Sequence, residues 1–140
     1  MILSSYDLDE AAKRCVLAEC FHLTHFKGFQ SRVIDAVLNE RDSLVIQPIG
    51  SGKSLCYQFP AVYTKRLTLV ITPTISLMQD QTNEMEKLGI SAIYLGSAQV
   101  DPSSESKALC AESNTSVVFV SPEWLYSDKN NYLKIVVAID

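Results

Sequence analysis

The sequence has few of the features that mark membrane, secreted or disulfide-stapled proteins. No apolar run among its 140 residues approaches the length of a membrane span, and the first residues lack the basic-then-apolar layout of a signal peptide. Four cysteines are present, but they form no Cys-x-x-Cys pair. We therefore expect reduced, mostly buried thiols in an intracellular protein that has no membrane partner.

Basic charge is also scarce. The chain has 12 Lys and Arg against 16 Asp and Glu, which gives a formal net charge of −4. This balance argues against a protein held on nucleic acid by bulk electrostatics. It does not exclude a protein that binds a nucleic-acid strand through a few backbone amides and hydroxyls. A hydrophobic content of 47% in a chain of this length predicts one globular domain with a real core.

The most informative stretch is the loop Gln47–Ser54, which reads Gln-Pro-Ile-Gly-Ser-Gly-Lys-Ser. The apolar run Ser43–Ile46 predicts a strand before it, and Leu55–Phe59 predicts a helix after it. Strand, glycine-bearing turn, Lys-Ser and helix form the pattern of a phosphate-binding loop, although Gln47 stands where the strict pattern has glycine. A Gly-Lys-Ser triplet also occurs by chance in solvated turns, but the flanking pattern favours nucleotide binding.

The residue types of this loop suit phosphate chemistry. Glycine at positions 50 and 52 lets backbone N–H groups come close to an anion. Lys53 can reach the outer phosphates, and the Ser54 hydroxyl suits a magnesium ion.

Apolar runs alternate with helical patterns along the whole chain. We expect helices near residues 7–21, 29–38 and 76–87, the last one capped by Gly89, and strands near 67–71, 92–95, 117–120 and 135–139. The first helix is expected to pack with one small-residue face, formed by Leu8, Ala11, Ala12, Cys15, Ala18 and Phe21.

This alternation predicts an α/β fold with a mostly parallel sheet flanked by helices. Ligands of such sheets lie at the carboxyl ends of the strands. We therefore expect one shared rim made of Gly50–Ser54, Pro73–Ser76, Ser121–Glu123 and Asp140.

The order of several short motifs resembles the first half of the motor core of RecQ-type DNA helicases in superfamily 2, most of all the Bloom and Werner group. The motifs are Phe26-Lys27-x-x-Gln30, the loop and helix Gly50–Gln58, Pro73-x-x-Ser76-Leu77-Met78-x-Asp80-Gln81, Leu95-Gly96-Ser97, Ser121-Pro122-Glu123 and the run Val136–Asp140. The resemblance implies a helix in residues 1–20 that precedes the motor. It also implies that residues 21–140 are part of the first RecA-like, P-loop NTPase lobe and end at the start of an Asp-Glu-x-His box.

The resemblance further implies ATP and Mg²⁺ as cofactors and single-stranded or partially duplex DNA as a partner. The adenine would be read by Gln30, and Lys27 would serve the same pocket or a nearby phosphate. The phosphates would be held by Gly50, Ser51, Gly52, Lys53 and Ser54, and the magnesium by Ser54 and Asp140. Lys53 and Asp140 would be the catalytic residues. The DNA would be contacted by Pro73, Thr74, Ser76 and Ser97.

Plainer interpretations stand beside these assignments. Gln30 can be an ordinary surface residue of a helix, Ser76 and Ser97 can be caps, and an Asp at the end of a strand is often a cap as well. Trp124 and Tyr126 are better explained by packing than by base stacking.

The sequence also departs from the family pattern. Ile49 replaces the usual Thr, Thr74 replaces the usual Leu, and Leu23 lies where many members have an aromatic residue or His. Asp140 is the first residue of the Asp-Glu-x-His box, and the Glu that would orient water is absent from these 140 residues. A second lobe with its arginine finger is absent as well. We therefore expect the chain by itself to bind ATP weakly and not to unwind DNA.

By resemblance, the parent protein is a 3′-to-5′ DNA helicase (hydrolase and isomerase) that acts in DNA repair, recombination and replication in the nucleus. Three alternatives remain open. They are a non-catalytic module that binds nucleotide or partner proteins, a small-molecule kinase with a P-loop, and a helicase that acts on RNA.

Overall fold

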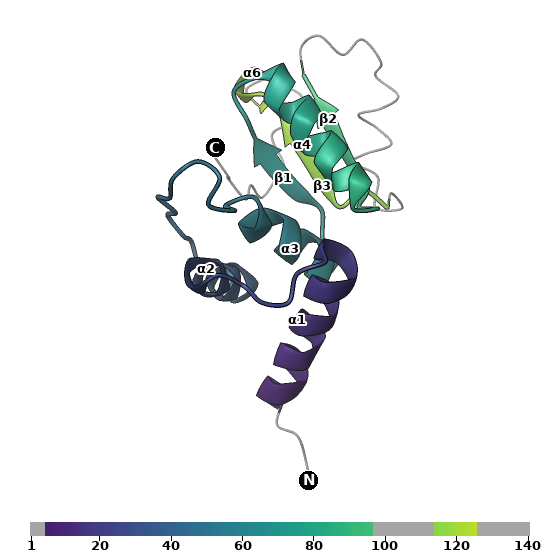
Figure 1. Ribbon diagram of the computed structural model, residues 1–140. Coiled ribbons are helices and arrows are strands. Elements are labelled where there is room, and N and C mark those ends of the chain that lie inside the picture. Colours follow the sequence, from purple (N-terminus) through teal and green to yellow (C-terminus); the bar gives the residue numbers. More distant parts are fainter. Residues whose placement is uncertain (1–4, 97–113, 126–140) are drawn as a thin grey trace. The chain divides into compact units, whose positions relative to one another are not determined.

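The computed structural model of the protein describes residues 5–96 and 114–125 (Figure 1). The chain divides into two compact units, residues 1–65 and residues 66–140. Each unit is described by itself below.

The first unit contains three helices, α1 (Ser5–Phe21), α2 (Gly28–Leu38) and α3 (Leu55–Thr64). Its core is aromatic and centres on the fully buried Phe59. The ring of Phe26 meets that of Phe59 edge-on at 4.8 Å, and the rings of Tyr63 and Phe59 stack at 5.5 Å. Phe21, at the end of α1, lies 6.0 Å from Phe59 between ring centroids. These ring pairs tie the end of α1 and the middle of α3 to the link before α2.

The face predicted for α1 is wrong at four of its six residues, whereas Phe21 is buried as predicted and the burial of Leu8 is not described. Ala11, Ala12, Cys15 and Ala18 are exposed, whereas Lys13, Leu17 and Phe21 are buried. Small side chains offer little apolar area to bury, so Leu17 and Phe21 determine which side of the helix faces inward. Lys13 joins them because carboxylates surround its ammonium group, as described below. The exposed Cys15 also corrects the expectation of mostly buried thiols.

The strand predicted at Ser43–Ile46 is not formed. Residues 41–48 have no regular secondary structure, and Leu44 and Ile46 are 88% and 82% exposed. A strand exists only when a neighbouring strand takes its backbone hydrogen bonds, and an apolar pattern specifies no partner. No such ladder is present among the residues that the structure describes.

The second unit is built on a parallel sheet. Its elements are β1 (Thr68–Ile71), α4 (Ile75–Lys87), β2 (Ala92–Leu95), β3 (Val117–Val120) and α6 (Pro122–Leu125). The described strands lie in the order β1-β3-β2, with Thr68 and Ala92 each paired to Val117. All four residues of β3 are buried, as expected of a central parallel strand covered on both faces. The α/β class with a parallel sheet is therefore confirmed.

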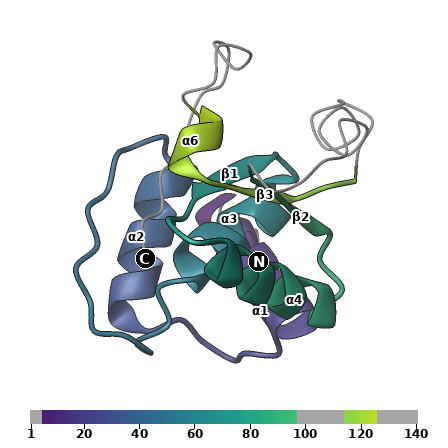
Figure 2. The ribbon, with the colours of Figure 1, turned by 90° about the horizontal axis from the view of Figure 1, so that it is seen from above.

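Helix α4 packs along β2 and β3 (Figures 1 and 2). It ends as predicted, because Gly89 adopts a φ of +73° and its N–H donates to the Glu86 carbonyl at 2.9 Å. Trp124 of α6 is buried in a cluster with Leu69, Leu95, Val118 and Val120. Trp124 is therefore a packing residue, as predicted, and not an exposed stacking platform.

Several expectations fall outside the described residues. They concern the strand at 135–139, Tyr126, Ser97 and Asp140. Within the described part of the chain, no helix combines the length and the apolar character needed to cross a bilayer.

Candidate nucleotide site

The loop before α3 has the backbone shape that its glycines predict. Gly50 and Gly52 adopt φ values of +79° and +93°, a region that other residues rarely occupy. The N–H of Ser51 donates to the Pro48 carbonyl at 3.2 Å, and the N–H of Cys56 donates to the Lys53 carbonyl at 2.9 Å. The loop therefore turns tightly and enters α3 through a turn that begins at Lys53.

The Lys53 ammonium group folds back onto the start of the loop. Its Nζ lies 3.3 Å from the carbonyl oxygens of both Gln47 and Pro48. These are long hydrogen bonds to neutral acceptors, so an anion would offer Lys53 a stronger partner.

Two residues from the start of α2 meet the loop. Lys27 Nζ donates to the Ser51 carbonyl at 2.7 Å, and Gln30 Nε2 donates to the Gly52 carbonyl at 2.8 Å. Gln30 is only 4% exposed, so it is not the surface helix residue of the plainer interpretation. The structure thus brings Lys27 and Gln30 to the loop Gly50–Ser54, although the bonded residues lie 22 and 24 positions apart in the sequence.

The residues of the loop fit a phosphate group. Ser51 Oγ is buried and has no hydrogen-bond partner among the described residues. Buried polar groups usually have a partner, and a phosphate oxygen could accept a hydrogen bond from this hydroxyl. The N-cap Ser54 makes no side-chain capping bond. Its hydroxyl is therefore not used to cap α3, where the N–H groups of Cys56, Tyr57 and Gln58 already donate to the carbonyls of Lys53 and Ser54. A loop of this kind favours an anion by hydrogen bonding and by the helix dipole.

Cys56, in the first turn of α3, is an inert neighbour of this loop. Its side chain is buried, and this burial raises the pKa of the thiol to about 11. A thiol that stays protonated at neutral pH is a poor nucleophile and a poor metal ligand.

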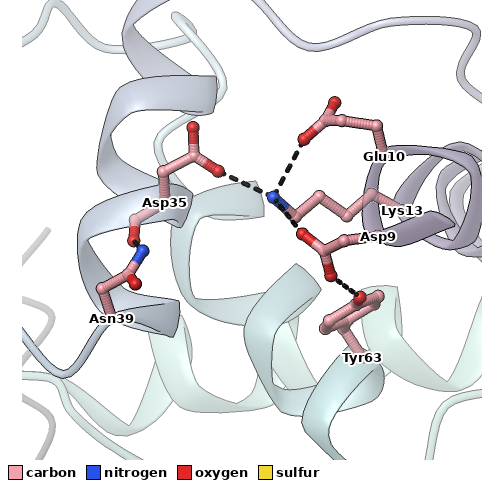
Figure 3. A network of polar contacts seen from close by, with 6 residues as sticks. All are labelled: Asp9, Glu10, Lys13, Asp35, Asn39 and Tyr63. Carbon is pink, nitrogen blue, oxygen red and sulfur yellow. Dashed lines mark hydrogen bonds and ion pairs between the residues drawn. The ribbon is translucent and has the colours of Figure 1, made fainter. Parts of the chain in front are cut away.

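A buried lysine lies at the centre of a polar network that joins α1, α2 and α3 (Figure 3). Lys13 of α1 is 7% exposed, and its Nζ lies 2.9 Å from Asp9, 3.0 Å from Glu10 and 2.9 Å from Asp35 of α2. Asp9 in turn accepts a hydrogen bond from the Tyr63 hydroxyl of α3 at 2.5 Å. We call Asp9, Glu10, Lys13, Asp35 and Tyr63 the three-helix clamp.

Charge in the clamp shifts three pKa values. Burial alone would lower the pKa of Lys13, but hydrogen bonds to Asp35, Asp9 and Glu10 outweigh it and raise that pKa above its ordinary 10.5. Hydrogen bonds from Tyr63 and Lys13 lower the pKa of Asp9 below 3.8. The same contact with Asp9 raises the pKa of Tyr63 above 10.0. At neutral pH Lys13 and Asp9 are therefore charged while the Tyr63 hydroxyl keeps its proton, and the contact of Lys13 with Asp35 holds α2, at whose start Lys27 and Gln30 lie.

Sequence reasoning missed the clamp. The pairs Asp9–Lys13 and Glu10–Lys13 have helical spacing and could have been found. Asp35 lies 22 residues from Lys13, and no local pattern links the two.

In the second unit, predicted DNA-contacting residues lie at the carboxyl edge of the sheet. Pro73, Thr74 and Ser76 are exposed just after β1. At the same edge the Ser121 N–H donates to the Leu95 carbonyl at 3.4 Å, which brings the ends of β3 and β2 together. The expected common rim is thus present for the segments that follow β1 and β3.

Capping at this edge differs from the expectation. Thr74, not Ser76, is the N-cap of α4, because its Oγ1 accepts from the Leu77 N–H at 3.3 Å. Ser121 Oγ accepts from the Trp124 N–H at 3.2 Å and so caps α6. The replacement of the family's usual Leu by Thr74 therefore has a structural explanation, because Thr74 caps α4. Ser76 is not the cap and is exposed at this edge.

Comparisons with known proteins agree with this fold. A sequence profile described as DEAD/DEAH box helicase matches residues 27–139, which is more than half of the chain. The chain belongs to the DEAD/DEAH box helicase family.

The resemblance to RecQ-type helicases is confirmed by individual relatives. The ATP-dependent DNA helicase RecQ of Haemophilus influenzae is 36% identical over 96% of this chain and 22% of its own length. RecQ of Pasteurella multocida is 46% identical over 77% of this chain and 17% of its own length. The bifunctional 3′-5′ exonuclease/ATP-dependent helicase WRN of mouse is 41% identical over 74% of this chain and 7% of its own length. The chain thus spans about a fifth or less of these relatives.

A solved structure shares the fold. The DUF1998 helicase MrfA, in a crystal structure with DNA and AMPPNP, superposes with a TM-score of 0.67 at 20% identity, over 84% of this chain and 17% of that one.

Proposed function

We propose that the chain is the nucleotide-binding part of an ATP-dependent DNA helicase that moves 3′ to 5′ along single-stranded or partially duplex DNA. The observation that carries the proposal is the convergence of Lys27, Gln30 and Lys53 on one glycine-bearing loop at the start of a helix. The names of the RecQ relatives support the same activity. A nuclear role in DNA repair, recombination and replication follows as part of the proposal.

In the proposed site each residue has a separate task. The loop N–H groups and Lys53 bind the phosphates, and Ser54 takes part in holding Mg²⁺ together with Asp140. Gln30 would read the base, since an amide can pair in both directions with an adenine edge, and Lys27 would serve the same pocket or a nearby phosphate. ATP with Mg²⁺ supplies the phosphoryl group whose transfer drives the motor.

The edge after β1 supplies the proposed contacts to DNA. The Thr74 side chain caps α4 and so holds the first turn of this helix in place. Ser76 and the backbone of Pro73 and Thr74 then face solvent at this edge and suit contacts to phosphates without sequence preference. Ser97 is proposed to extend this contact from the turn after β2.

The nucleotide site is tested by competitive titration of a fluorescent ATP analogue. We expect ATP to compete better than GTP, and Lys53→Met to weaken binding roughly tenfold or more, because it removes a charged contact to phosphate. Lys87→Met, an exposed lysine in the last turn of α4, is the matched control. Equal binding by the Lys53 and Lys87 variants would contradict the assignment.

The activity is tested by ATP turnover with and without single-stranded DNA. The 140-residue chain is compared with a version extended through a second motor lobe of the family. DNA-stimulated turnover only in the longer version supports a helicase. No turnover in either supports a binding module, and turnover on a small acceptor supports a kinase. DNA-stimulated turnover by the 140 residues alone would refute the expectation that they lack the full catalytic set.

A further inference from the structure

The three-helix clamp contacts α2 at the end that lies away from the phosphate loop. Lys13 Nζ of α1 donates to Asp35 Oδ1 at 2.9 Å, and Asp35 belongs to the last turn of α2. The residues of α2 that contact the loop lie at its other end. Five residues separate Gln30 from Asp35, which is about 7.5 Å along a helix axis. One short, rigid helix therefore connects the ion pair to the loop.

Helix α1 is itself held against α3. Leu17 and Phe21 are buried, and the ring of Phe21 lies 6.0 Å from that of Phe59 in α3. The Tyr63 hydroxyl of α3 donates to Asp9 of α1. Since α3 continues directly from the phosphate loop, α1 links the helix that follows the loop to the helix that contacts it from the side.

The pair Lys13–Asp35 is the salt bridge of the clamp that joins two helices. Of the three carboxylates around Lys13, Asp9 and Glu10 belong to α1 itself, whereas Asp35 belongs to α2. Lys13 is only 7% exposed, so its ammonium group has lost most of its water and depends on these carboxylates. Salt also screens a partly buried pair less than an exposed one. The contact between α1 and α2 therefore has a fixed geometry.

We infer that Lys13 and Asp35 are positioning residues for the phosphate loop, because their ion pair fixes α2 relative to α1 and α3. Without this pair the last turn of α2 is free to shift, and a rigid helix passes the shift on to its first turn. The bonds of Lys27 and Gln30 to the loop then change, and so does the loop. Helix α1 thereby influences nucleotide affinity without touching the nucleotide.

The inference rests on the proposed function for its ligand, and the first test uses ATP. Asp35→Ala removes the partner of Lys13 on α2, but alanine has the highest helix propensity, so α2 itself is not weakened. In the competitive titration of a fluorescent ATP analogue, we expect ATP affinity to fall about fivefold, the low end of the range for coupled sites. Asp35→Glu keeps the carboxylate and should restore most of the affinity.

Tyr63→Phe is the matched control. It breaks the bond between α3 and Asp9 but leaves the pair of Lys13 with Asp35 intact. We expect it to lower the melting temperature and to leave ATP affinity unchanged. The inference is overturned if Tyr63→Phe weakens ATP binding as much as Asp35→Ala does, because affinity would then only follow stability. It is also overturned if Asp35→Ala, folded by circular dichroism, binds ATP as the unsubstituted chain does.

A ligand-free measurement separates this inference from the proposed function. In amide NMR spectra of Asp35→Ala we expect the resonances of Gly52 and Lys53 to move, while that of Gly89 in the second unit stays in place. Asp35→Asn, which keeps the shape of the side chain, serves for the same measurements if the alanine variant does not fold. Unchanged loop resonances would overturn the inference even in a chain that binds ATP. Shifted loop resonances in a chain that binds no ATP would uphold the positioning of the loop and refute the proposed function.

Discussion

Replacing Lys13 by Met is the sharpest test of how the first unit is held together. The variant keeps most of the alkyl stem but removes the ammonium group that three carboxylates share at 2.9–3.0 Å. Asp9, Glu10 and Asp35 would then repel one another with no cation between them. Their side chains are 44%, 34% and 46% exposed, so water can solvate them once the lysine is gone.

The loss of unfolding free energy expected for Lys13→Met lies between two limits. Breaking a fully buried ion pair costs about 3–5 kcal/mol, whereas each solvent-exposed pair contributes roughly 0.2–1 kcal/mol. Three pairs that share one buried cation and three half-exposed anions give a loss of about 2 kcal/mol. With a urea dependence near 2 kcal/mol per molar, the unfolding midpoint should fall by about 1 M.

The measurement is urea unfolding followed by far-ultraviolet circular dichroism, to which the three helices of the first unit contribute most of the helical residues. Trp124 fluorescence is unsuitable because that residue belongs to the second unit. Arg14→Met, one residue along and exposed on α1, is the control and should change the midpoint little. Asp35→Asn, which removes one of the three ion pairs, should lie between the two. The reasoning fails if the Lys13 and Arg14 variants unfold at the same urea concentration.

Three further results are expected. Tyr63→Phe should lose about 1 kcal/mol, the contribution of its hydrogen bond to the charged Asp9. Since the pKa of Tyr63 is raised, that contribution is present below pH 10.0 and lost as the pH rises through the folded-state pKa. Thermal melts of the parent should therefore show an alkaline loss that the Phe variant lacks. Thr74→Ala should cost roughly 1 kcal/mol of stability by removing the N-cap of α4, whereas Thr74→Ser should cost little. In thiol labelling followed by mass spectrometry, the exposed Cys15 should react first, and the buried Cys56, with a pKa of about 11, should react only after unfolding.

Local patterns predicted much of the second unit. The runs at 92–95 and 117–120 became strands with the predicted bounds, because apolar side chains on both faces of a short segment favour the middle of a parallel sheet. The helix ending before Gly89 was also predicted, since a glycine with positive φ is a local C-terminal signal.

What the sequence could not predict depends on contacts between distant residues. A lysine on a helix is ordinarily assigned to solvent, and only Asp35 on another helix completes the reason for burying Lys13. The run Ser43–Ile46 has the composition of a strand, but composition does not supply a neighbour to pair with. The candidate site was predicted by residue type, while the bond from Gln30 to the Gly52 carbonyl became visible only in three dimensions.

The strand order of the second unit has a kinetic consequence. β1 and β2 precede β3 in the chain, yet each of them pairs with β3 and they do not pair with each other. During synthesis β1 and β2 therefore cannot form their hydrogen bonds to β3 until Val117–Val120 has left the ribosome. Pairing across such long sequence separations slows folding and leaves apolar strands open to aggregation. Among the described strands, β3 thus joins β1 and β2, and a polypeptide interrupted before Val117 would lack the strand with which both of them pair.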